Sequence, residues 1–213
     1  MGGTSLWAAE SLPPRAYCRF PTLHGDVAVF TSEGDLWRVS IGGGLAQRLT
    51  THPGNETQAA FSPDGRTLAF IGEYEGPKEV YTMPSTGGLP VRRTFRGGNN
   101  RVVGWTPDGQ ILFSTDAFAT LPALQLVSLN LETGAERVLP LAQASQGSVD
   151  PSGKTLIFSR LFKQPSSTKR YQGGWIESLW RFSEGDAEAV ALTSDFKGTS
   201  RSPLWWRERI YFV

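Results

Sequence analysis

The sequence predicts an all-β protein, a β-propeller built from four-stranded blades, and three observations support this prediction. A turn motif of the Pro-Asp-Gly type recurs along the chain, an apolar strand ending in an aromatic residue follows each copy, and the copies are spaced like propeller blades. The 24 glycines and 14 prolines among 213 residues also suit many short strands joined by tight turns better than long helices.

The turn motif marks the first hairpin of each unit. Proline presets φ for a turn, and aspartate and glycine tolerate the left-handed backbone that a tight reversal needs. Clear copies occupy residues 61–70, 105–113 and 149–158, and degenerate copies occupy 22–30 and 204–212. The strand-ending aromatics are Phe30, Phe70, Phe113, Phe158 and Phe212, at spacings of 40, 43, 45 and 54 residues. Propeller blades of ~40–50 residues fit this period.

A second half completes each unit. A third strand is predicted in each unit, at 35–39, 79–83, 125–129 and 178–182. A glycine-containing turn follows it, and then a short outer strand is predicted at 47–50, 91–94, 136–139 and 190–193. With the strand that precedes each turn motif, every unit has four strands, and such units close radially around a channel. A solenoid would repeat at shorter intervals, and a two-sheet sandwich would not repeat its turn chemistry so regularly.

The repeats divide the chain into an N-terminal extension, 1–19, and an incomplete propeller, 20–213. Blades are predicted at 20–53, 54–96, 97–142 and 143–196, and the start of a fifth at 197–213. Because the chain ends within a strand-like run at Val213, we expect about four complete blades of a longer polypeptide. An insertion at 161–176 explains the longest spacing, and it either contributes to recognition or is an exposed loop without a binding role.

Charge and composition exclude several kinds of partner. The formal net charge is +1 and the basic residues are dispersed, so neither nucleic acid nor an anionic membrane is expected to bind. No run approaches the ~20 apolar residues that span a bilayer. The N-terminus lacks the pattern of a secretory signal, so a cytoplasmic location is expected. The single cysteine, Cys18, cannot form an internal disulfide and is expected to be a partly buried small residue.

No catalytic residue, metal ligand or cofactor site is predicted in this chain. The two histidines, His24 and His52, have no carboxylate partners at metal-ligand spacing, and one cysteine cannot support a structural zinc site. The Gly-x-Ser-x-Gly, His-Glu-x-x-His and phosphate-loop motifs are missing. His24 is expected to serve a turn, and the aspartates of the turn motifs are expected to stabilise turns rather than to act as acids or bases.

Four stretches together resemble the propeller region of tricorn-type serine peptidases. The first stretch consists of residues 20–26, Phe30 and residues 35–37, and the second consists of 104–109 and 111–116. The third consists of 171–174 and 179–180, and the fourth consists of 202–203 and 209–212. The resemblance runs from about residue 20 to the end of the chain.

The resemblance implies a function for the whole polypeptide and a parent ring of six blades. Tricorn-type enzymes are large cytoplasmic oligomers that trim peptides released by the proteasome or similar proteases, and their catalytic serine and histidine lie in C-terminal domains. Their six-bladed propeller forms a channel for peptides. An arginine pair in the propeller region can bind the carboxylate of the peptide's C-terminus. The matching stretch here, 96–101, lacks an adjacent pair and leaves Arg96 and Arg101 as candidate substrate-binding residues.

Two other functions remain open from the residues alone. A TolB-like propeller would bind a protein partner at one face of the ring and would catalyse nothing. A propeller of the oligopeptidase type would precede an α/β-hydrolase domain. The sequence that follows this chain distinguishes all three hypotheses.

Overall fold

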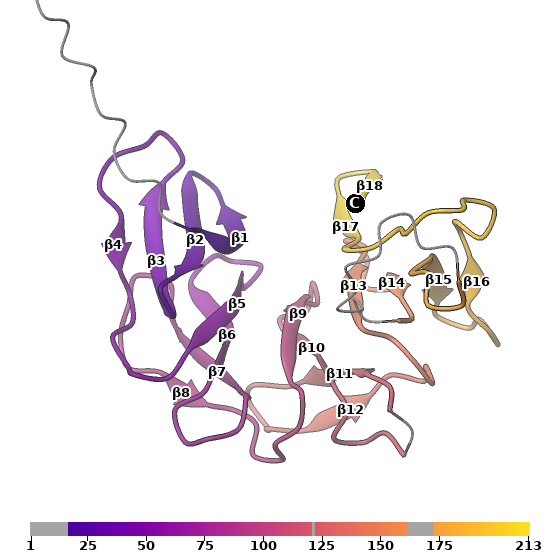
Figure 1. Cartoon of the computed structure of the whole chain (residues 1–213), viewed down its shortest axis with the longest axis horizontal. Coiled ribbons are helices and arrows are strands. Elements are labelled where there is room, and N and C mark those ends of the chain that lie inside the picture. The colour runs from indigo at the N-terminus through magenta and orange to yellow at the C-terminus, as the bar shows by residue number, and fades with distance from the viewer. Residues whose placement is uncertain (1–16, 121, 162–172) are drawn as a thin grey trace, which may run out of the picture.

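The fold is an all-β array, as the sequence predicted. A computed structural model describes residues 17–120, 122–161 and 173–213 and is drawn in Figure 1. Its described residues form eighteen strands and no helix, so they contain no helix that could cross a membrane. The sheets lie along an arc, with the first sheet at one end and the last hairpin at the other (Figure 1).

Four sheets of four strands follow one another along the chain. Blade 1 contains β1 (Arg19–His24), β2 (Val27–Ser32), β3 (Asp35–Ser40) and β4 (Gln47–Arg48). Blade 2 contains β5 (Glu56–Phe61), β6 (Thr67–Gly72), β7 (Glu79–Pro84) and β8 (Val91–Arg92). Blade 3 contains β9 (Arg101–Trp105), β10 (Ile111–Thr115), β11 (Gln125–Leu129) and β12 (Glu136–Val138). Blade 4 contains β13 (Gln146–Val149), β14 (Thr155–Ser159), β15 (Leu179–Ser183) and β16 (Val190–Ala191).

Each blade is an antiparallel meander in sequence order, and the hairpin of β17 (Leu204–Trp206) and β18 (Arg209–Tyr211) follows blade 4. The first strands of successive sheets contact one another, β1 with β5, β5 with β9, β9 with β13 and β13 with β17. The first strands are therefore the inner strands of the arc. In a meander, the turns after the first and third strands lie at one edge, and the loops after the second and fourth strands lie at the opposite edge.

The turn aspartates of blades 2 and 4 stabilise the first hairpin of their blade, as predicted. Asp64 Oδ1 accepts hydrogen bonds from Ser62 Oγ at 2.6 Å and from the Arg66 N–H at 3.1 Å. These bonds lower the pKa of Asp64 below its ordinary value, and the bond from the Ser62 hydroxyl contributes most. Asp150 likewise accepts from the N–H groups of Lys154 and Thr155 at 2.9 and 2.8 Å.

One turn glycine has a second reason for its identity. Gly65 has a φ of +71°, and a Cβ there would lie 2.2 Å from the ring of His24. His24 ends β1 and its ring also lies 5.7 Å from that of Phe61 in the next blade. The histidine thus joins blade 1 to the turn of blade 2 by packing. Cys18, expected to be partly buried, is exposed because it precedes β1, a strand with few buried residues.

The core consists of three seams in which neighbouring blades pack face to face. In β6, Leu68 and Phe70 face blade 1 while Ala69 and Ile71 face blade 3, and all four are buried. Because a central blade is covered on both faces, its second strand is apolar throughout rather than alternating. Phe70, Phe113 and Phe158 are each at most 2% exposed, which explains the recurring aromatic residue in the sequence.

A threonine just beyond the outer strand repeats in three blades. The Oγ1 atoms of Thr50, Thr94 and Thr193 accept hydrogen bonds from the backbone N–H groups of Leu36, Val80 and Leu179 at 2.9, 2.9 and 3.0 Å. The outer strands of all four blades are shorter than the sequence predicted, and in three of them this threonine bond follows the end of the strand. Blade 3 has Pro140 at the corresponding position.

The Thr94→Val variant is expected to unfold about 1–3 kcal/mol more easily, because the Val80 N–H is left buried without its acceptor. Urea unfolding followed by tryptophan fluorescence measures the difference. Thr51→Val is the matched control, since Thr51 is exposed and adjacent to Thr50. Equal losses in the two variants would contradict a structural role for the buried hydroxyl.

Blades 1 and 2 each contain an ion pair at a position where blades 3 and 4 have uncharged residues. Asp35 pairs with Arg48 at 2.5 Å, and the buried Glu79 pairs with Arg92 at 3.0 Å. The same two positions hold Gln125 and Val138 in blade 3, and Ser178 and Ala191 in blade 4. The acidic and the basic residue of the pair are thus replaced together. This agrees with the large loss of stability that follows when one buried charge is left without its partner.

Candidate functional site

Two parts of the described chain are candidate sites for binding a ligand. The first is the connection between blades 2 and 3, residues 95–101, which holds the predicted arginines. The second is a groove between blades 3 and 4 at the opposite edge of the sheets. Within the described part of the chain, no group of three or more histidine, cysteine or acidic side chains is positioned to hold a metal ion.

Hydrogen bonds to two acidic side chains hold the 95–101 connection in place. Glu79 accepts from the Gly97 N–H at 2.9 Å and from Asn100 Nδ2 at 3.1 Å. Asp116 accepts from the backbone N–H and the side chain of Asn99 at 2.8 and 2.5 Å. The backbone bond from Asn99 is the main reason that the pKa of Asp116 lies below its ordinary value. Bonds within the chain therefore fix the conformation of the connection.

A glycine is needed at the centre of this connection. Gly98 has a φ of +89°, and a Cβ there would lie 2.6 Å from Asp116 Oδ1. The backbone thus approaches the carboxylate more closely than any residue with a side chain permits.

The structure places the two predicted arginines in different surroundings. Arg96 donates from Nε to Glu136 Oε2 at 2.7 Å and lies 4.9 Å from the centre of the Phe118 ring. Its charge is therefore already paired, and a carboxylate ligand would have to compete with Glu136. Arg101, at the start of β9, is half-buried and its side chain makes no hydrogen bond or ion pair with the described residues. The two residues lie at the two ends of one connection, and their role in substrate binding stays a prediction.

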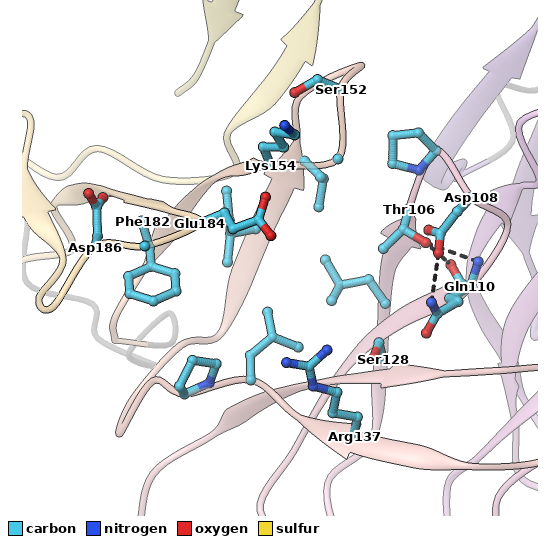
Figure 2. Close-up of a pocket in the computed structure, with 18 residues that line it drawn as sticks. Thr106, Asp108, Gln110, Ser128, Arg137, Ser152, Lys154, Phe182, Glu184 and Asp186 are labelled. Carbon is cyan, nitrogen blue, oxygen red and sulfur yellow. Dashed lines mark hydrogen bonds between the residues drawn. The ribbon is translucent and has the colours of Figure 1, made fainter.

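The groove between blades 3 and 4 has a volume of about 930 Å³ (Figure 2). Turns of both blades form its rim, at 106–110, 152–154 and 184–186. Its walls are two facing rows of side chains that run across the strands. One is Leu112–Ser128–Arg137 of blade 3, and the other is Val149–Leu156–Phe182 of blade 4.

The acidic side chains of the groove differ in what they already bind. Asp108 accepts from Gln110 Nε2 at 2.7 Å, and the Thr106 hydroxyl followed by the Gln110 amide lowers its pKa. Asp186 accepts from the Ser183 N–H at 2.8 Å. Glu184 makes no side-chain hydrogen bond or ion pair with the described residues. Asp108 and Asp186 thus have hydrogen-bond donors within the chain, whereas Glu184 has none among the described residues, and all three carboxyl groups line the groove.

The basic residues of this groove do not stand out in the sequence, although the repeat contains the signal. Arg137 corresponds in register to Gln47, Val91 and Val190 of the other blades, so a guanidinium there is peculiar to blade 3. Recognising Arg137 from the sequence requires the strand register, which the repeat gives only after the outer strands of the blades are aligned.

The insertion at 161–176 falls largely on residues 162–172, which lie outside the described residues.

Comparison with known proteins supports the resemblance drawn from the motifs. A family model described as the tricorn protease N-terminal beta propeller domain matches residues 15–213. Tricorn protease homolog 1 of Streptomyces coelicolor is 33% identical over 200 residues, which cover 93% of this chain and 19% of that protein. The chain thus spans about a fifth of the length of the curated relatives it matches.

Solved structures agree on the architecture. The crystal structure of the tricorn protease superimposes with a TM-score of 0.78 and 24% identity, over 92% of this chain and 20% of that one. A putative TolB from Agrobacterium tumefaciens superimposes with a TM-score of 0.71 and 21% identity, over 88% of this chain and 65% of that one. At these identities the structural likeness establishes the propeller fold alone. The family model, which covers nearly the whole chain, decides the family: the chain belongs to the tricorn proteases and carries their N-terminal β-propeller domain.

Proposed function

We propose that this propeller forms part of the wall of a channel through which peptides pass, in a tricorn-type serine peptidase whose catalytic domains lie elsewhere in the same polypeptide. The observation that supports the proposal most is the match of the family's N-terminal propeller to residues 15–213. The inner strands of the sheets, β1, β5, β9 and β13, contact one another in succession. Strands arranged in this way leave an axial space whose width depends on the number of blades.

The physical role of such a channel is selection by size. An axial opening between blades admits an extended peptide and rejects a folded protein, whose diameter is several times that of a single chain. In this proposal the peptides are those released by the proteasome or a similar protease, and the enzyme is a cytoplasmic homo-oligomer. These finer points rest on the family alone. The likeness to TolB is one of fold and does not favour the alternative of a non-enzymatic interaction propeller.

A peptidase assay tests where the chemistry resides. We expect residues 1–213 alone to leave a fluorogenic peptide uncleaved, and the complete polypeptide that contains them to cleave it in a reaction that a serine-directed fluorophosphonate inhibits. Inhibitor-sensitive turnover by residues 1–213 alone would contradict the proposal. So would a complete polypeptide that neither cleaves the peptide nor reacts with the fluorophosphonate, and this second outcome would favour an interaction propeller.

A further inference from the structure

The inner strands share one equivalent position near their start, which its partner in the second strand identifies. The pairs are Arg19 with Thr31, Thr57 with Ile71, Arg101 with Ser114, and Gln146 with Ser159. Arg201 takes this position in the last hairpin, because its N–H and C=O groups exchange hydrogen bonds with Val213, both at 2.9 Å. Val213 stands four residues after the start of β18, just as Thr31 stands four residues after the start of β2.

Arginine occupies this position in every other unit. Arg19, Arg101 and Arg201 belong to blade 1, blade 3 and the last hairpin, and the uncharged Thr57 and Gln146 lie between them along the series. The inner strands follow the inside of the arc (Figure 1). Because every blade has the same strand order, all inner strands begin at the same edge of the sheets. The three arginines, dispersed in the sequence, therefore lie around one end of the axial space.

Negative charge on the inner strands is limited to one residue. Among β1, β5, β9, β13 and β17, the only acidic side chain is that of Glu56. Glu56 is fully buried, and burial raises its pKa to about 7. Below that pH it keeps its proton and adds no charge. The inner strands are therefore positively charged at this end, although the whole chain has a formal net charge of only +1.

The charges of the three arginines are little compensated within the chain. Arg101 makes no hydrogen bond or ion pair with the described residues. Arg19 is exposed, and its guanidinium lies 5.7 Å from the centre of the Phe20 ring. Arg201 lies 3.9 Å from Glu177 Oε2, a separation at which the ion pair neutralises it only in part.

Other acidic residues of this edge lie further from the axis. Asp35, Glu73 and Glu79 are each paired with a basic residue of their own blade. Glu33 and Asp116 keep their charges, but they lie in the loops that follow the second strands. The second strands are one strand removed from the inner strands, so the arginines lie closer to the axis than these carboxylates.

From these observations we propose that this end of the axial space attracts peptides with a net negative charge. Like charges around an opening with walls of low dielectric constant focus the field there and raise the local concentration of opposite charge. The proposal names a class of peptide for the proposed channel and rests on that function. It requires charge alone, and so differs from the predicted binding of one terminal carboxylate by Arg96 or Arg101.

Fluorescence anisotropy at pH 6 tests the proposal in the complete polypeptide, with its nucleophilic serine blocked by a fluorophosphonate. The probes are two labelled peptides of glycine and serine with amidated C-termini, one with three glutamates and the other with three glutamines in their place. We expect the glutamate peptide to bind about tenfold more tightly in about 20 mM NaCl. The preference should fall below about twofold in about 0.5 M NaCl, where screening acts within a few ångström.

Variants of the three arginines locate the effect. Replacing Arg19, Arg101 and Arg201 together with glutamine should make the two peptides bind alike, whereas replacing all three with lysine should keep the preference. Arg19→Gln alone, at an exposed position, should already lower it. The matched control replaces Arg66, Arg137 and Arg209 with glutamine, because these arginines are exposed and lie outside the inner strands.

The proposal is wrong if the unaltered protein binds both peptides equally, or if the variant with three glutamines keeps the preference. It is also wrong if the control variant loses the preference to the same extent, since the net charge of the chain would then be the cause. Failure of the channel function would appear instead as a complete polypeptide that is inactive in the peptidase assay, so the two failures can be told apart.

Discussion

Truncation of Phe113 to alanine is expected to destabilise the chain by about 3–5 kcal/mol, the range typical of a buried phenylalanine that leaves a cavity. Phe113 is 2% exposed at the seam between blades 2 and 3. There it packs in a cluster with Ile71 and Val80 of blade 2 and with Val127 of its own blade. Since each blade buries its apolar faces only against its neighbours, one cavity weakens the contact between two whole blades.

Urea unfolding of the Phe113→Ala variant, followed by tryptophan fluorescence, measures this loss. Leu45→Ala is the control, because Leu45 is 97% exposed and its truncation should change stability by less than ~0.5 kcal/mol. If Phe113→Ala loses no more than Leu45→Ala, the seams between blades do not hold the fold together as described.

The second large effect is a loss of stability as the pH rises from 4.5 to about 7, caused by Glu56. This carboxyl group is fully buried at the start of β5, and burial raises its pKa from an ordinary 4.5 to about 7. The hydrogen bond from Thr50 Oγ1 at 2.8 Å, the hydroxyl of Tyr74 and the charge of Arg48 oppose the shift, while Asp35 adds to it.

The sign follows from proton binding. Between these two pH values the folded chain keeps the proton on Glu56 while the unfolded chain has released it, so each step upward in pH favours unfolding. The contribution is complete below pH 4.5 and is lost by the time the pH has passed 7, a change of about 3 kcal/mol. Glu56→Gln, which cannot ionise, should be the more stable protein at pH 8 and should lack this part of the pH dependence.

Unfolding free energies of both proteins at pH 5, 6, 7 and 8 test this prediction. Glu33→Gln is a suitable control, since Glu33 is exposed in the turn between β2 and β3. Parallel pH profiles for Glu56→Gln and the unaltered chain would show that Glu56 does not titrate in this range.

Local patterns predicted the blades because each blade is built from local turns. The turn aspartates, the strands after them and the phenylalanines that fill the seams all follow from residues close in sequence. The shared threonine was harder to recognise, because its partner lies fourteen residues away on the neighbouring strand. The role of the threonine depends on the hydrogen-bond register between strands, and no short sequence motif predicts that register.

The candidate sites depend on contacts that are longer still in sequence. Arg96 is a candidate substrate-binding residue from the sequence, and this stays a prediction. Its acidic partner Glu136 lies forty residues further on, so the ion pair between them is seen only in the structure. The groove is formed by two blades, so the residues of either wall alone do not predict it from the sequence. Burial of Glu56 was equally hidden, because a glutamate at the start of a strand is ordinarily exposed.

The channel role is tested most directly by the size selection of the complete polypeptide. A fluorogenic peptide is offered free in solution and also as a linker between two stably folded domains. We expect the intact enzyme to cleave the free peptide and leave the linker uncut, and a variant lacking residues 20–213 to cleave both. Equal cleavage of the free peptide and the linker by the intact enzyme would contradict the channel role.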